Sequence, residues 1–149
     1  MADAGGMKLV FRLGGVGFAL PVRDLIEVAE VPVAQLEAGS GDDAAYMDGW
    51  LLRRGEAVPL FNLARRLRLS VPAATGQLTV IVMAGADGPW SIVVERIEGI
   101  FPGGEFVLVP VAEWMFQRAS WPFERLALWR EQPLIHCESL ALESRWGNR

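Results

Sequence analysis

The sequence is poor in the residues from which disulfides, metal sites and nucleic-acid surfaces are usually built. Of its 149 residues, one is cysteine (Cys137) and one is histidine (His136). A single cysteine excludes an intramolecular disulfide, and these two neighbours cannot supply the three or four ligands of a typical zinc site. Lys8 is the only lysine, the net charge is −4 and the pI is about 5.0. The chain as a whole therefore lacks the basic footprint of nucleic-acid binding.

Long apolar runs are also missing. No stretch approaches the roughly 18 residues that a membrane-spanning helix needs, and the longest run, 78–86, is interrupted by Thr79. Residues 1–6 contain neither a basic region nor an apolar stretch, so we predict a flexible N-terminus that is not a secretory signal. These absences predict a cytoplasmic protein without direct membrane insertion. Apolar residues still make up 52% of the chain, which suits one compact domain with some apolar surface left for partners.

The reactive side chains do not form a convincing catalytic set. If 134–137 is a strand, His136 and Cys137 point to opposite faces and cannot form a dyad. The glycine cluster at 14–17 is not followed by a Lys-Ser/Thr pair, so it predicts a hairpin turn and not a phosphate loop. We therefore expect no enzymatic activity, no cofactor and no metal. The six tryptophans raise the alternative of a ligand pocket, but aromatic residues in a small barrel more often belong to a core or an interface.

What the chain has in plenty is short alternating segments separated by turn signals. This pattern is typical of an all-β sandwich or barrel. The predicted strands are 8–13, 18–22, 49–54, 57–61, 78–84, 90–95, 97–101, 106–111, 125–129 and 134–137. Two short helices are expected, one over 63–69 capped by Asn62 and one over 138–146 that buries Leu140 and Leu142.

Other segments are less regular. Residues 23–31 could form a helical turn capped by Asp24 or a strand that ends at Pro32. The Gly/Ser/Asp-rich stretch 32–47 predicts a mobile loop, and 112–123 predicts irregular or partly helical structure. Pro59 lies inside a predicted strand, which favours an edge or bulged position for that strand. Gly99 predicts a bulge.

One segment carries a family resemblance. Residues 49–63, Gly-Trp-Leu-Leu-Arg-Arg-Gly-Glu-Ala-Val-Pro-Leu-Phe-Asn-Leu, run as a glycine, a short strand, Arg-Gly, a turn, then hydrophobic-Pro-hydrophobic and a capped helix. This order resembles the signature of CheW-like domains. The hairpin around 14–17, and the later hairpin from Thr79 with the strand that follows, fall in the order that the family shows. The resemblance covers roughly residues 8–145.

The resemblance implies a fold and a role. CheW-like domains are mostly β, with two SH3-like five-stranded barrels sharing a core, and they act as non-enzymatic chemotaxis adaptors. Their partners are the regulatory domain of a CheA-type histidine kinase and the cytoplasmic tip of a chemoreceptor. For this chain we expect a CheW-like domain over 7–146, with one subdomain at about 16–77 and the other at about 7–15 plus 78–146.

The matching positions imply a contact site at the 49–59 hairpin. We expect Arg54, Arg53, Trp50, Leu52 and Val58 to bind partners. Gly49, Gly55 and Pro59 are expected to shape the turn and its strands, with Gly55 taking a positive φ. Arg54 has a competing interpretation, in which it stabilises the fold by bonding carbonyl groups at the barrel junction.

Other functions stay open at this point. A diverged CheW-like barrel could serve another signalling pathway, or it could bind a small apolar ligand between its halves. A third possibility is a thiol-dependent enzyme that uses Cys137.

Overall fold

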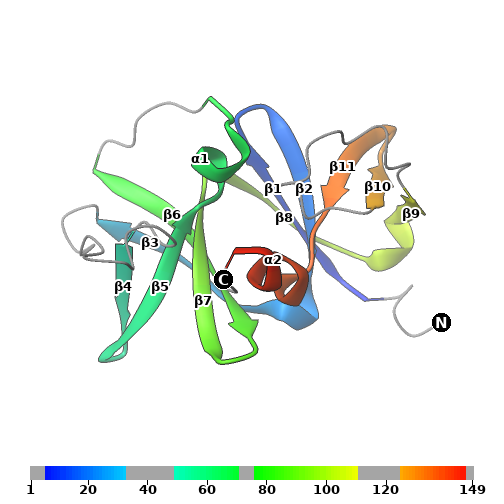
Figure 1. The fold of residues 1–149 in the computed structure, drawn as a ribbon. Helices are drawn as coiled ribbons and strands as arrows, with labels where there is room; N and C mark the ends of the chain where they lie inside the picture. The colour runs from blue at the N-terminus through cyan, green and yellow to red at the C-terminus, as the bar shows by residue number, and fades with distance from the viewer. Residues whose placement is uncertain (1–5, 33–48, 71–75, 111–124, 147–149) are drawn as a thin grey trace.

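The computed structural model describes residues 6–32, 49–70, 76–110 and 125–146. These residues form two β-sheets with short helices, in the order that Figure 1 shows. The predictions for 1–5, for most of the 32–47 loop and for 112–123 lie outside the described residues. The alternating segments became strands because each can bury one face, which confirms the expected mostly β class.

Sheet A has six strands in the order β8-β1-β2-β11-β10-β9. Only β2 and β11 run parallel; every other neighbouring pair is antiparallel. β8 and β9 are consecutive in the chain, with the 3-10 turn η5 (Gly103–Glu105) between them, yet they lie at the two edges of the sheet. The strands are β1 (Lys8–Leu13), β2 (Val16–Pro21), β8 (Arg96–Phe101), β9 (Phe106–Pro110), β10 (Arg125–Trp129) and β11 (Gln132–His136).

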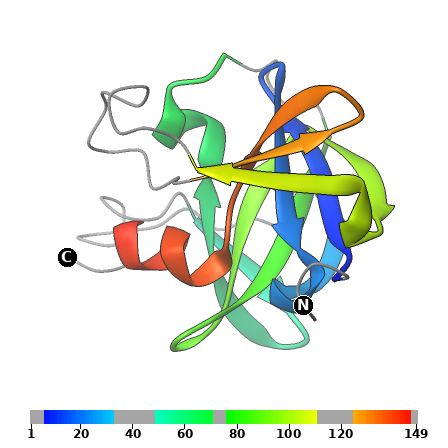
Figure 2. The same ribbon diagram turned by 90° about the vertical axis from the view of Figure 1, so that its right-hand side faces the viewer.

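Sheet B has five strands in the order β3-β6-β7-β5-β4. Here β5 and β7 run parallel and the other pairs are antiparallel. Figure 1 shows the two sheets side by side, and Figure 2 looks onto the sheet A side, with the C-terminal helix beside it. The strands are β3 (Leu25–Pro32), β4 (Gly49–Arg53), β5 (Glu56–Asn62), β6 (Gln77–Gly85) and β7 (Gly88–Val94).

The two sheets do not follow the expected subdomains, 16–77 and 7–15 plus 78–146. A boundary between residues 15 and 16 would separate β1 from β2, yet these two strands pair along their whole length. A boundary at 77–78 would separate β3 from β6, which also pair throughout. A two-residue hairpin turn keeps its two strands adjacent, so the first hairpin stays in one sheet. Sheet B is instead formed by the continuous middle of the chain, and sheet A by its two ends.

Three apolar clusters occupy three places. One lies inside sheet A and includes Val10, Ala19 and Trp129, and another lies inside sheet B and includes Leu51, Val58 and Val80. The largest is shared between the sheets, because it joins Phe11 and Phe18 of sheet A to Phe61, Met83 and Trp90 of sheet B. Each sheet thus has its own interior, and the two pack on a common core, as the resemblance implied.

Several local predictions can now be decided. Residues Val22–Asp24 form the 3-10 turn η2 and the rest of 23–31 is strand β3. Asn62 caps α1 (Leu63–Leu67), since its side chain accepts a bond from the Arg65 amide. A register shift in the β1–β8 pair occurs where Val10 faces Gly99, which confirms the bulge.

Two predictions were wrong. Leu140 is 60% exposed, while Leu142, two residues further along α2 (Ser139–Trp146), is fully buried. The strand with Pro59 is not at an edge, because β5 lies between β7 and β4, and its pairing with β4 has no bulge. The parallel pairing with β7 begins only at Leu60, so the missing amide of Pro59 interrupts nothing there.

Helix α2 is attached to η2 and to sheet B through its first residue. The Ser139 amide donates to Asp24 Oδ2 over 2.9 Å, so Asp24 caps a helix 115 residues away. The Ser139 hydroxyl accepts from the Trp90 indole over 2.9 Å and donates to the Ala84 carbonyl. A fully buried serine with these partners fixes the chain end on the β6–β7 hairpin.

Candidate functional site

The β4–β5 hairpin, which carries the expected contact residues, is the edge hairpin of sheet B. Its strands pair from Gly49 with Leu60 to Arg53 with Glu56, so Arg54 and Gly55 are the two turn residues. Arg54 has φ 51° and Gly55 has φ 82°. Positive φ at both positions is the type I′ geometry, which matches the twist of the flanking strands. The expected positive φ of Gly55 is confirmed.

One face of this hairpin runs from the shared core into solvent. Trp50 faces Pro59, and Leu52 faces Ala57 across the strand pair. Trp50 and Pro59 are half-buried, with Trp50 packed on the shared core, while Leu52 is 68% exposed and Ala57 is also exposed. We call these four residues the hairpin face. Apolar surface is thus continuous from the junction of the sheets to the hairpin tip.

Arg54 stands at the end of the hairpin face. It is exposed and, within the described ranges, makes no hydrogen bond or ion pair. The competing interpretation, in which Arg54 bonds carbonyl groups at the barrel junction, therefore finds no support in this part of the chain. A non-glycine residue in the left-handed region carries a conformational cost. The guanidinium at this position is available to a partner.

Arg53 lies on the opposite face and has an intramolecular partner. Its Nε donates to Glu27 Oε1 over 2.7 Å, and the Arg53 side chain is only 18% exposed. Because β4 and β3 are the two edges of sheet B, this ion pair joins the edges and closes the sheet into a barrel. The geometry gives Arg53 a structural task, whereas Arg54 has none in the described residues.

The remaining expected residues divide in the same way. Val58 is 2% exposed inside sheet B, so the expectation that its side chain contacts a partner does not fit this fold. In β5, Val58 alternates with Ala57 and Pro59, and only the latter two share the outward face. Gly49 is buried at the start of β4, and Pro59 accepts a bond on its carbonyl from the Ser91 hydroxyl.

Cys137 has the features of a structural cysteine. Its thiol is 2% exposed and donates to the Ala19 carbonyl, while His136 contacts Lys8 instead. Burial raises the pKa of the Cys137 thiol well above its usual range, so the thiolate needed for nucleophilic attack does not form. Among the described residues, no cluster of three or more His, Cys, Asp or Glu side chains could hold a metal ion. No helix in the described ranges is long and apolar enough to cross a membrane.

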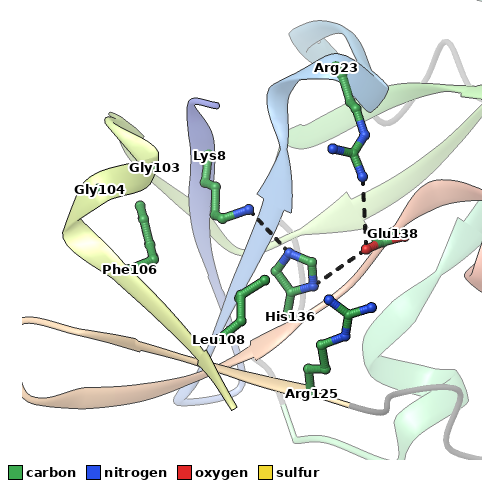
Figure 3. A pocket seen from close by; sticks show the side chains of 9 residues that line it. All are labelled: Lys8, Arg23, Gly103, Gly104, Phe106, Leu108, Arg125, His136 and Glu138. Atoms are coloured by element: carbon green, nitrogen blue, oxygen red, sulfur yellow. Dashed lines mark hydrogen bonds and ion pairs between the residues drawn. The ribbon is translucent and has the colours of Figure 1, made fainter. Parts of the chain in front are cut away.

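The sequence reasoning missed a second site, on sheet A. Lys8, Arg23, Arg125, His136 and Glu138 line one pocket of about 470 Å³, shown in Figure 3. These residues are scattered along the chain, so no motif in the sequence brings them together. The one signal in the sequence was the lone lysine, Lys8, at the start of a strand whose next three residues are apolar.

Comparison with known proteins agrees with this architecture. A family model described as CheW-like domain matches residues 8–108. The solved structure of the scaffolding protein TtCheW from Thermoanaerobacter tengcongensis superposes with a TM-score of 0.73 at 15% sequence identity, covering 93% of this chain and 92% of that one. No curated protein matches the sequence.

Two barrel-like sheets on a shared core, with an exposed apolar hairpin at one edge of sheet B, define a double-barrel β fold. The family match extends over more than half of the chain, and this protein belongs to the CheW-like domain family. The expected two-barrel fold is confirmed, although sheet A has six strands and not five.

Proposed function

We propose that this protein is a non-enzymatic adaptor of chemotaxis signalling, which joins a CheA-type histidine kinase to methyl-accepting chemoreceptors in the cytoplasm. The observation that carries the proposal is the hairpin face, with exposed Leu52 at its outer end and Arg54 at its tip. Family membership and the scaffolding role of the solved relative support the same function.

The chemistry of the hairpin face suits a protein partner. Apolar residues flanked by arginine are typical of interface centres, where the guanidinium fixes orientation and apolar contact supplies affinity. The expected partners are the regulatory domain of the kinase and the cytoplasmic tip of a receptor. We expect micromolar complexes, about −8 kcal/mol, because transient signalling contacts are small.

The test is co-purification with the regulatory domain of each chemotaxis kinase from the same organism, with wild type, Arg54→Glu and Arg68→Glu. Arg68 is a matched control: it is also an exposed arginine with positive φ, at the end of α1. Any strain that glutamate adds at positive φ is therefore common to both variants. We expect the complex to be lost only in Arg54→Glu.

One result would contradict the adaptor function, and another would contradict the contact site. No complex between the wild type and any kinase or receptor fragment would remove the adaptor function. Equal binding by folded Arg54→Glu and Arg68→Glu would keep the adaptor and place its contact elsewhere on the surface.

A further inference from the structure

The pocket on sheet A lies away from the hairpin face and is lined by segments from both ends of the chain. Lys8 comes from β1, Arg23 from η2, Arg125 from β10 and His136 from β11, and Glu138 precedes α2. Figure 3 shows these side chains converging around the imidazole of His136. The volume of about 470 Å³ falls in the range of roughly 300–1,000 Å³ that small-molecule sites occupy.

The side chains that line this pocket carry a net positive charge, whereas the whole chain carries a net negative charge. Three cationic side chains line it against one carboxylate, in a chain whose net charge is −4. Glu138 Oε2 lies 4.0 Å from Arg23 and 3.9 Å from His136, and Arg23 also lies 4.0 Å from Asp24 Oδ1, which is not part of the pocket lining. Arg125 forms no ion pair with any residue of the described ranges. Concave positive charge of this kind focuses field lines and raises the local concentration of anions.

The contact between Lys8 and His136 fixes the protonation state of the imidazole. Lys8 is buried, and its Nζ lies 3.3 Å from His136 Nε2. An ammonium group can only donate, so Nε2 accepts and the ring proton is on Nδ1. The imidazole is therefore neutral, and Lys8 Nζ lies beside it in the lining of the pocket.

The opposite wall is apolar. Phe106 and Leu108 of β9 line it, and Gly103 and Gly104 of η5 contribute backbone without side chains, which leaves room for a ligand. The site thus combines a cationic end with an apolar end. A ligand that fits both has an anionic head and an apolar or aromatic body.

We infer that this pocket is a binding site for a small organic anion, whose carboxylate or phosphate group is held by Lys8, Arg23 and Arg125 and whose body packs on Phe106 and Leu108. Guanidinium groups bind both oxyanions through paired hydrogen bonds, which accounts for two arginines beside one lysine. The inference is independent of the adaptor function, because no residue of the hairpin face takes part.

The experiment uses the only histidine of the chain as a reporter. The imidazole proton resonance of His136 is followed by NMR while the full-length protein is titrated with phenyl phosphate, benzoate or neutral benzyl alcohol at constant ionic strength. We expect one or both anions to shift the resonance saturably and to raise the pKa of His136 above its value of about 4 in the free protein. Saturation by phenyl phosphate alone identifies a phosphate ester site, and saturation by benzoate alone a carboxylate site.

Arg125→Gln and Arg54→Gln form the matched pair of variants. Both remove one exposed arginine, but only Arg125 lines the pocket. We expect Arg125→Gln to weaken anion binding by roughly tenfold or more, the usual loss for a charge-assisted bond, and Arg54→Gln to leave it unchanged. The inference is overturned if neither anion gives a saturable shift at millimolar concentration, if benzyl alcohol binds equally well, or if both variants bind like the wild type.

Discussion

Arg53 on β4 donates a hydrogen bond to Glu27 on β3 over 2.7 Å, and these strands are the two edges of sheet B. The ion pair therefore links the ends of a five-stranded sheet and protects both edges. The two adjacent arginines therefore differ in role, because Arg53 closes the barrel and Arg54 is exposed to solvent.

The first prediction concerns this closure. Arg53→Ala and Glu27→Gln should each lower the free energy of unfolding, with a coupling of about 1 kcal/mol in a double-mutant cycle, since both side chains are partly exposed. Chemical denaturation of the four proteins measures it. Glu30→Gln, an exposed acid on the same strand, is the control. A coupling near zero would show that the barrel closes without this pair.

The second prediction concerns the apolar end of the hairpin face. Leu52→Asp should weaken the kinase or receptor complex by roughly tenfold or more, because a charge replaces an apolar anchor. Its free energy of unfolding should change by no more than about 0.5 kcal/mol, as at other exposed positions. Leu140→Asp on α2 is the control, since Leu140 is similarly exposed. Equal binding by both variants in a calorimetric titration would remove Leu52 from the interface.

The third prediction concerns the left-handed conformation of Arg54. Arg54→Gly should raise the free energy of unfolding by up to about 1 kcal/mol, because glycine adopts φ 51° without steric cost. The same variant should lose partner binding. Arg68→Gly should gain stability in the same way and keep binding. If Arg54→Gly binds normally, the strained arginine serves no partner.

The fourth prediction concerns the buried Ser139. Ser139→Ala leaves the Trp90 indole N–H without its acceptor, so the free energy of unfolding should fall by about 1–3 kcal/mol. Denaturation followed by tryptophan fluorescence measures this loss. Ser70→Ala, at an exposed position after α1, should be close to neutral. A neutral Ser139→Ala would mean that the Ser139 hydroxyl contributes nothing to holding α2 in place.

The fifth prediction concerns pH. Burial lowers the pKa of His136 from 6.5 to about 4, with the Lys8 charge as the next cause. Below pH 6.5 the imidazole of His136 becomes protonated in the unfolded chain, but in the folded chain it stays neutral down to about pH 4. The free energy of unfolding therefore falls as the pH drops between these values.

His136→Gln should remove this part of the pH dependence. The wild type should lose up to roughly 3 kcal/mol more than the variant across that interval, because one pKa unit corresponds to about 1.4 kcal/mol. Unfolding at a series of pH values checks the difference. Parallel curves for the two proteins would contradict the neutral, buried state of the imidazole.

The local half of this fold could be predicted from the sequence. The alternation in 8–13 and 49–54, the turn glycines and the Asn62 cap act over a few residues, and the structure has strands, turns and a cap there. Gly55 was assigned its positive φ for the same reason, since the conformation depends on the turn itself.

The non-local half could not be predicted. Pairing of β2 with β11, and of β5 with β7, depends on contacts between distant segments that leave no periodic signal. The burial of Val58 depended on which face of β5 became the interior of the barrel. The pocket was missed for the same reason, because Lys8 and His136 are 128 residues apart.

Along the chain, the strands of sheet B lie between the first and the last strands of sheet A, and this order has a consequence for synthesis of the protein. All strands of sheet B are contained in residues 25–94, so this barrel can close while the ribosome is still making the rest of the chain. The hairpin of β1 and β2 must wait for β11, which ends at His136, and its unpaired edge is exposed until then. The barrel whose first strands are made first is therefore completed last.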